Sequence, residues 1–373
     1  MSTTPTTTTE TTETTETISS DNVDTDDAAR TFVLDGNSLV AGCTTITFIR
    51  TLRVSDSGTN ALPPGFGTFT LRAVDPTDMR LPAHIRERGG VMLPIHQHEA
   101  MWMSFSADRY NPVALQIGAG GRCAVTGSAI SDSLTQDPQN YVVLPKQPWL
   151  DGFKTADGKV RQFVAVALGS GHTVEKQLTG QETVGGLQLQ VRELEENARR
   201  ALAERLREEK QAAGMFAGTM PSSIVSDVDM DLGAGIVYCC LSSPMGLGAG
   251  GEIVQEIFAD AHRIDDWSTE PLDKVWIHLV AATDWPALTG EPVPTSPISL
   301  DDYVKAGLPW FDYIDAHATD VATTPEMSNL KSIHELGGIE GIEPVVTVDS
   351  PGVRVLGPDS LHRGTWTWTG ESI

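Results

Sequence analysis

The chain has 373 residues, 40% of them hydrophobic, and carries 26 Lys and Arg against 50 Asp and Glu, a formal net charge of −24. This length corresponds to roughly two domains, and the hydrophobic fraction is ordinary for a chain with a packed core. Nucleic acid binding requires clustered Lys and Arg that neutralise phosphates, so the acidic composition argues against it. We therefore expect no nucleic acid partner.

Membrane and export signals are missing from the sequence pattern. The longest apolar stretch, Leu232–Leu241, is well short of the ~20 residues that a membrane-spanning helix needs. The start of the chain has neither the basic region nor the apolar core of a secretory signal. Cys43, Cys123, Cys239 and Cys240 form neither a Cys-x-x-Cys pair nor a dense disulfide framework. We expect no membrane insertion and a cytoplasmic location with reduced thiols.

Residues 1–29 form a Thr- and Glu-rich tail. Ile18 and Val23 are its only sizeable apolar residues. Such a segment cannot bury enough apolar surface to offset the entropy lost on ordering, so we predict a disordered tail.

Residues 30–192 are dominated by short runs of β-forming residues that are separated by turn residues at intervals of roughly ten positions. The expected strands are residues 44–54, 67–74, 90–107, 112–118, 141–144, 160–168 and 186–191. Successive strands without intervening helices predict a mainly antiparallel β-sandwich or barrel. Between residues 153–155 and the run that begins at Val160, Asp157-Gly158 predicts a hairpin with a type I′ turn, because that dipeptide tolerates positive φ angles.

Residues 193–214 change to helical periodicity. One face of the expected amphipathic helix carries Leu194, Ala198, Ala201, Leu202 and Leu206. Charged residues at i,i+4 spacing occupy the other face, and Gly214 is a suitable C-terminal stop. We expect the apolar stripe to pack on the protein's own core.

Residues 215–373 form a mixed segment. Strands are expected at 235–241 and 274–281, with a helix at 252–261 between them. Short helices are expected from Ser299 to Gly307 and over 326–336, followed by terminal strands at 344–348, 353–356 and 365–369. The predicted class is therefore α+β, predominantly β: a sandwich or barrel followed by a smaller mixed α/β module.

His96 and His98 are the candidate metal ligands. Residues i and i+2 of a strand share a face, so both imidazoles can reach one metal ion if the segment is a strand. The pair in an all-β setting resembles the cupin barrel, but Trp102 occupies the position of the cupin carboxylate and also that of the second histidine of a His-Glu-x-x-His motif. The alternative is two surface histidines on a strand.

Gly246, Gly248 and Gly251 fit the Gly-x-Gly-x-x-Gly pattern between an expected strand and an expected helix, a context in which backbone amides bind a pyrophosphate. The acid that contacts the ribose is expected about 20 residues further on. Asp265 and Asp266 have that offset but precede the next strand, so a glycine-rich turn for tight packing is the alternative.

Trp310, Trp366 and Trp368 are the candidate binding aromatics, with core packing as the alternative.

Several blocks of residues carry a family resemblance. They are residues 90–94 with 99–105, 147–152 with 161–165, 245–251, and 307–313. Together these blocks resemble a family of uncharacterised bacterial proteins, also found in some fungi, that are sometimes labelled integral membrane proteins. The resemblance covers residues 50 to 335 and implies one shared architecture. It implies no catalytic residue, and its membrane label conflicts with the hydropathy of this chain.

The sequence contains no recognisable set of nucleophile, base and orienting residue. We therefore expect a soluble protein with a binding or structural role, acting on a protein partner or through self-assembly, and we expect no cofactor. The alternative is an enzyme, with a divalent metal at His96 and His98 or with a site between the two modules.

Overall fold

The computed structural model describes residues 32–214, 244–297, 299, 310–313, 318–340 and 353–356. Several expected features lie outside these residues. They are the tail at 1–29, the strand at 235–241, the helix from Ser299 to Gly307, the terminal strands at 344–348 and 365–369, and the side chains of Trp366 and Trp368.

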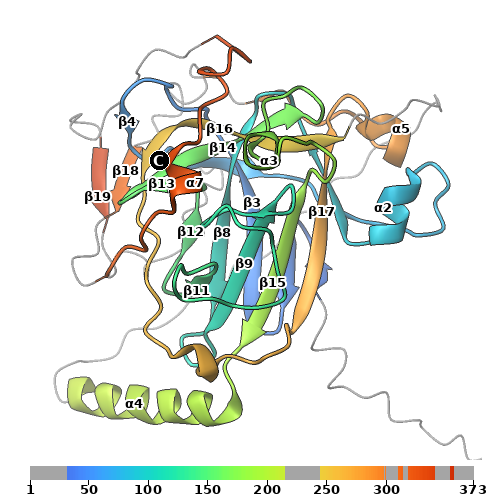
Figure 1. Ribbon diagram of the computed structural model, residues 1–373. Coiled ribbons are helices and arrows are strands. Elements are labelled where there is room, and N and C mark those ends of the chain that lie inside the picture. Colours follow the sequence, from blue (N-terminus) through green and yellow to red (C-terminus); the bar gives the residue numbers. More distant parts are fainter. Residues whose placement is uncertain are drawn as a thin grey trace, which may run out of the picture.

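Two β-sheets share one large hydrophobic core (Figure 1). The first sheet has the order β1 (Val33–Asp35), β2 (Ser38–Ala41), β3 (Thr44–Thr51), β8 (Ala100–Ala107), β14 (Lys159–Ala167), β16 (Met245–Val254) and β4 (Thr59–Asn60). Three further strands join it at its side: β5 (Gly65–Thr68) on β3, β12 (Trp149–Leu150) on β8 and β13 (Gly152–Ala156) on β14.

The second sheet has the order β10 (Arg122–Cys123), β9 (Val113–Ala119), β15 (Leu187–Glu193), β17 (Asp273–Ala281), β7 (Val91–Ile95) and β6 (Arg72–Ala73), with β11 (Val142–Leu144) on β9. A separate pair, β18 (Trp310–Tyr313) and β19 (Val353–Leu356), is parallel. Most other pairings are antiparallel, and the exceptions are β16 with β4 and β17 with β7. The predicted α+β, mainly β class is confirmed.

Alternation along the strands explains which side chains fill the core. In β15, Leu187, Leu189 and Val191 belong to the main core cluster and are 0% exposed. Because successive side chains of a strand point to opposite faces, Gln188 and Gln190 lie on the other face of the sheet. Burying each large apolar side chain contributes about 1.5–3 kcal/mol, so such strands fix the register of the sheet.

The hairpin at Asp157-Gly158 is confirmed. Strands β13 and β14 pair antiparallel, with Ala156 opposite Lys159. Gly158 has a φ of 66°, but His98 is the described non-glycine residue with a positive φ, so Asp157 does not adopt one. The turn is therefore not of type I′, and a register shift between Lys154 and Ala156 takes up the difference.

The amphipathic helix is present as α4 (Glu196–Gly214), which lies across one end of the sheets (Figure 1). Its stripe packs in a second core cluster, where Leu194 is 4% exposed and Leu202 and Leu206 are each 8% exposed. Trp267 and Tyr141 also belong to that cluster. The helix therefore packs on the protein itself through Ala198, Leu202 and Leu206, as expected, but Ala201 is exposed and Leu194 precedes the helix.

The remaining helices are short: α2 (Ala83–Arg88), α3 (Val174–Thr179), the 3-10 helix η1 (Ile264–Asp266), α5 (Trp285–Thr289) and α7 (Pro325–Ser328). The helix expected over 326–336 is thus limited to one turn, followed by hydrogen-bonded turns. No helix among the described residues is both long and apolar enough to cross a membrane.

The helix expected at 252–261 is wrong, because β16 continues to Val254 and extended chain follows it. Backbone pairing with β14 along the whole of β16 overrides the helical spacing of Ile253, Ile257 and Phe258. The two modules expected on either side of the helix at 193–214 also share both sheets. Strand β16 lies beside β14 in the first sheet, and β17 lies between β15 and β7 in the second.

Candidate functional site

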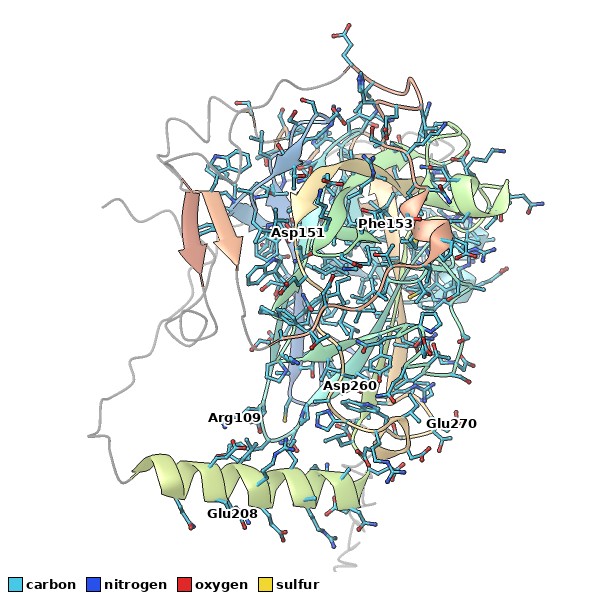
Figure 2. All side chains as sticks on the ribbon, turned by 60° about the vertical axis from the view of Figure 1, so that its left-hand side comes forward. Arg109, Asp151, Phe153, Glu208, Asp260 and Glu270 are labelled. Carbon is cyan, nitrogen blue, oxygen red and sulfur yellow. The ribbon has the colours of Figure 1, made fainter. Side chains whose placement is uncertain are left out.

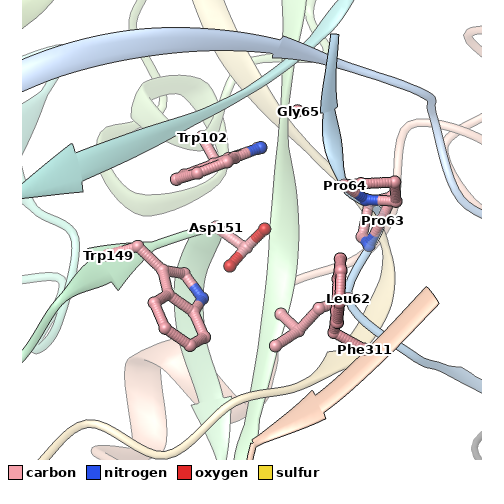
Figure 3. A pocket seen from close by; sticks show the side chains of 8 residues that line it. All are labelled: Leu62, Pro63, Pro64, Gly65, Trp102, Trp149, Asp151 and Phe311. Carbon is pink, nitrogen blue, oxygen red and sulfur yellow. The ribbon is translucent and has the colours of Figure 1, made fainter. Parts of the chain in front are cut away.

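A small recess opens beside the first sheet (Figure 3). Its lining residues come from four separate stretches of chain: Leu62, Pro63, Pro64, Gly65, Trp102, Trp149, Asp151 and Phe311. The centre of a water molecule can occupy about 40 Å³ of it, which is room for a group of a few non-hydrogen atoms. Except for Asp151, the lining side chains are apolar or aromatic.

Strand pairing positions the walls of this pocket. Trp102 lies on β8, and Trp149 begins β12, which pairs with β8. The opposite wall is held by a two-way backbone bridge in which the Leu62 N–H donates to the Phe311 carbonyl (2.7 Å) and the Phe311 N–H donates to the Leu62 carbonyl (3.0 Å). The pocket therefore brings residues 62–65, Trp102 and residues 149–151, which belong to the first expected module (30–192), next to β18 of the second (215–373).

Gly65 is required by the close packing of this wall. A Cβ atom added there would lie 2.4 Å from Cγ2 of Ile49 and 3.1 Å from Cζ2 of Trp102. Real Cβ atoms do not make a contact of 2.4 Å and rarely make one of 3.1 Å, so any larger residue here would force Ile49 to move and would crowd the indole ring. The Trp102 ring is in turn 6% exposed, and its indole nitrogen has no hydrogen-bond partner among the described residues.

Asp151 is the ionisable group of the pocket and is 2% exposed. Its carboxyl accepts a hydrogen bond from Nε2 of Gln255 (3.0 Å) and another from the indole of Trp149. Burial raises the pKa of Asp151 to about 8, against the opposing effect of the bonds from Trp149 and Gln255. The group is therefore mostly a neutral acid at pH 7.

Figure 3 shows the Asp151 carboxyl between the two indole rings, with the nitrogen of Trp149 on the side facing it. Leu62, Phe311 and the two prolines lie across the pocket. The arrangement combines one buried carboxyl with aromatic and aliphatic walls. Such a site can bind a small group that is mainly apolar and has one polar or charged atom.

A second buried carboxylate, Asp260, differs from Asp151 because it accepts hydrogen bonds from more protein donors. It accepts bonds from the Tyr141 hydroxyl (2.5 Å), the Trp267 indole (2.8 Å) and Nδ1 of His262 (3.0 Å). Figure 2 shows Asp260 nearer to α4 than Asp151. These contacts tie the loop after β16 to the core cluster beneath α4, so we read Asp260 as a structural group.

His96 and His98 lie in a turn and not on a strand. Strand β7 ends at Ile95 and β8 begins at Ala100, and His98 has a φ of 65°. The i,i+2 rule therefore does not apply. Nε2 of His96 donates to the Thr295 carbonyl (3.0 Å), whereas Nε2 of His98 accepts from the Gln97 amide (3.0 Å).

Glu99, in the same turn, pairs with Arg50 and accepts a bond from the backbone N–H of His96 (2.9 Å). The two imidazoles therefore have different partners, and these contacts do not direct them at one metal ion. Among the residues that the structure describes, no group of three or more His, Cys, Asp or Glu side chains is placed to hold a metal ion.

Gly246, Gly248 and Gly251 lie within β16, without the loop and following helix that a pyrophosphate site requires. Their role is close packing. An added Cβ would lie 2.8 Å from Cγ2 of Thr173 at Gly246, 2.8 Å from the His172 carbonyl at Gly248, and 2.0 Å from the Ser55 carbonyl at Gly251.

Trp310 is 7% exposed and belongs to the main core cluster, next to the pocket residue Phe311. The other two candidate tryptophans, at 366 and 368, lie outside the described residues. Of the three candidate tryptophans, the structure therefore describes the side chain of Trp310, which lies beside the pocket and packs in the core.

The sequence reading missed Trp102, Trp149 and Asp151 as site residues. A signal was present, because three of the blocks that carry the family resemblance, residues 99–105, 147–152 and 307–313, each supply lining residues of this one pocket. Their meeting depends on strand pairings that a sequence pattern does not reveal.

No protein-family model, no curated protein and no solved structure matches this chain. The site is therefore interpreted from its own geometry.

Proposed function

We propose that this chain is a cytoplasmic binding protein whose pocket at Asp151 takes a small organic ligand. The observation that carries the proposal is a buried carboxyl at the wall of an apolar recess, flanked by Trp102 and Trp149. Concave sites with apolar walls and few polar groups are the common form of small-molecule sites. The described free thiols, Cys43 and Cys123, suit a reducing compartment.

The lining favours binding over catalysis. General acid and base chemistry, or attack by a nucleophile, needs at least two polar groups aimed at one reacting atom. Asp151 is the titratable residue among the eight described residues that line the pocket. A ligand held there meets one carboxyl and otherwise apolar walls.

The described surface also favours ligand binding over self-assembly. Its exposed large apolar residues are Val33 (53%), Met79 (77%) and Val293 (49%), from three separate stretches of the chain. Three such residues are few for the contiguous apolar patch that marks an interface.

The test is ligand-observed NMR on the full chain with a panel of small cationic and neutral organic compounds, compared between the natural protein and Leu62→Trp, which fills the pocket. Val293→Trp adds the same side chain at an exposed position and is the matched control. We expect Leu62→Trp to abolish binding and Val293→Trp to retain it, with both variants keeping cooperative thermal unfolding. Equal binding by all three proteins would refute the proposal.

A further inference from the structure

If Asp151 ionises, its carboxylate has no counterion among the described residues. Its two side-chain partners, Gln255 and Trp149, are neutral donors. By contrast, the buried Glu99 pairs with Arg50, and the partly buried Asp320 pairs with Lys154. Ionising Asp151 therefore needs a cation from outside this part of the chain.

The site is nevertheless built to accept the ionised form. Both side-chain bonds to Asp151 come from N–H donors, and its backbone is fixed because its own N–H donates to Oε1 of Gln255 (2.9 Å). These donors favour the carboxylate and lower the pKa, whereas burial favours the neutral acid and prevails. A cation placed beside the carboxyl would reverse that balance.

The walls select the kind of cation. A bare metal ion needs several oxygen or nitrogen ligands, and the pocket offers one carboxyl. Indole and phenyl rings instead attract an organic cation through their π faces while they bury its alkyl groups. Trp102, Trp149 and Phe311 supply such rings, and the roughly 40 Å³ open to the centre of a water molecule limits the group to a few non-hydrogen atoms.

We propose that the pocket takes the ammonium head group of a small alkylammonium compound, with its charge against the Asp151 carboxylate and its alkyl groups against Trp102, Trp149 and Phe311. This inference rests on the proposed function, since it names the ligand class of the same pocket. An oxygen atom next to the ammonium group, as in an amino alcohol, would also supply an acceptor for the unpartnered indole N–H of Trp102.

The experiment is isothermal titration of the full chain with choline and with its neutral isostere 3,3-dimethyl-1-butanol, between about pH 6 and about pH 9. We expect choline to bind at least roughly tenfold more tightly than the isostere, since only choline gains the ion pair and the cation–π contacts. Its affinity should rise with pH and level off above about 8, because binding below that pH displaces a proton from Asp151. Two buffers of different ionisation enthalpy measure this proton release.

Asp151→Asn keeps the size of the side chain and removes its charge, so it should abolish the preference for choline and its pH dependence. If this variant does not fold, the pH profile and proton release of the natural protein still decide. Equal or tighter binding of the isostere, or a preference for choline that does not change with pH, would overturn the inference while leaving a ligand-binding pocket. Failure of both probes and of the wider panel to bind would overturn the proposed function as well.

Discussion

The ammonium group of Lys154 forms an ion pair with Asp320, and the lysine side chain is 0% exposed. Asp320 also accepts bonds from the backbone N–H groups of Gly158 (2.6 Å) and Ile257 (2.8 Å). One carboxylate thus joins the β13–β14 hairpin, the chain after β16 and the segment at 318–340. Burial lowers the pKa of Lys154 despite the opposing effect of Asp320, so the ammonium group depends on this partner.

We predict that Asp320→Ala lowers the free energy of unfolding by about 3–5 kcal/mol, because it leaves a buried charge without its counterion. Asp132→Ala is the control, since Asp132 pairs with Lys274 at exposures of 69% and 45%. An exposed pair of this kind is worth at most about 1 kcal/mol. Urea unfolding measures both changes, and similar losses would contradict the structural role of the buried pair.

Asp151 should make stability depend on pH even without ligand. Its folded pKa, about 8, lies above the ordinary aspartate value of 3.8, so the folded state retains a proton that the unfolded state has lost. The contribution to stability is therefore fully present below the unfolded pKa and declines as pH rises toward about 8, by up to about 1.4 kcal/mol per pH unit. Unfolding of the natural protein and of Asp151→Asn over this range should diverge accordingly, and parallel curves would show that Asp151 is ionised.

The opposite sign is expected for Asp260. Burial raises the pKa of Asp260, but the bonds from His262, Tyr141 and Trp267 together lower it below the ordinary aspartate value. Its contribution is then present above the unfolded pKa and is lost as pH falls through the folded value. Asp260→Asn should be destabilised by about 1–3 kcal/mol near neutral pH, with the deficit shrinking in acid. A deficit that stays constant down to about pH 2 would exclude this ionised role.

The glycines of β16 should differ in their tolerance of alanine. At Gly251 the added Cβ meets a backbone carbonyl, that of Ser55, at 2.0 Å, whereas at Gly246 it meets the movable Thr173 side chain at 2.8 Å. We expect Gly251→Ala to lower the unfolding free energy by roughly 1–3 kcal/mol more than Gly246→Ala, because a backbone segment cannot yield without strain. Thermal unfolding of the two variants compares them, and equal losses would show that the chain near Ser55 yields readily.

Local patterns in the sequence predicted most of the strands that the structure describes. Alternation in β3, β14, β15 and β17 is a property of neighbouring residues, and so is the stripe of α4. The turn at His98 could not be predicted from the sequence pattern, because the apolar residues of β7 end just before it and those of β8 begin just after it, so residues 90–107 resemble one strand. The helix at 252–261 failed because pairing with β14 outweighs local spacing.

The pocket could not be predicted for a related reason. Trp102, Asp151 and Phe311 are far apart in the chain, and they meet through the pairing of β12 with β8 and the bridge between Leu62 and Phe311. The raised pKa of Asp151 depends on burial by all these segments. Conversely, the two histidines and the glycine pattern were conspicuous in sequence but depended on local geometries that the chain does not adopt.

The placement of β16 and β17 has a consequence for synthesis of the chain on the ribosome. Until residues 245–281 emerge, β14 and β15 each lack the neighbour that these strands provide, and β7 is separated from the rest of its sheet. Open strand edges of this kind are the usual starting points of aggregation. About three quarters of the polypeptide must therefore be made before either sheet has all its central strands, so these edges stay unpaired through most of synthesis.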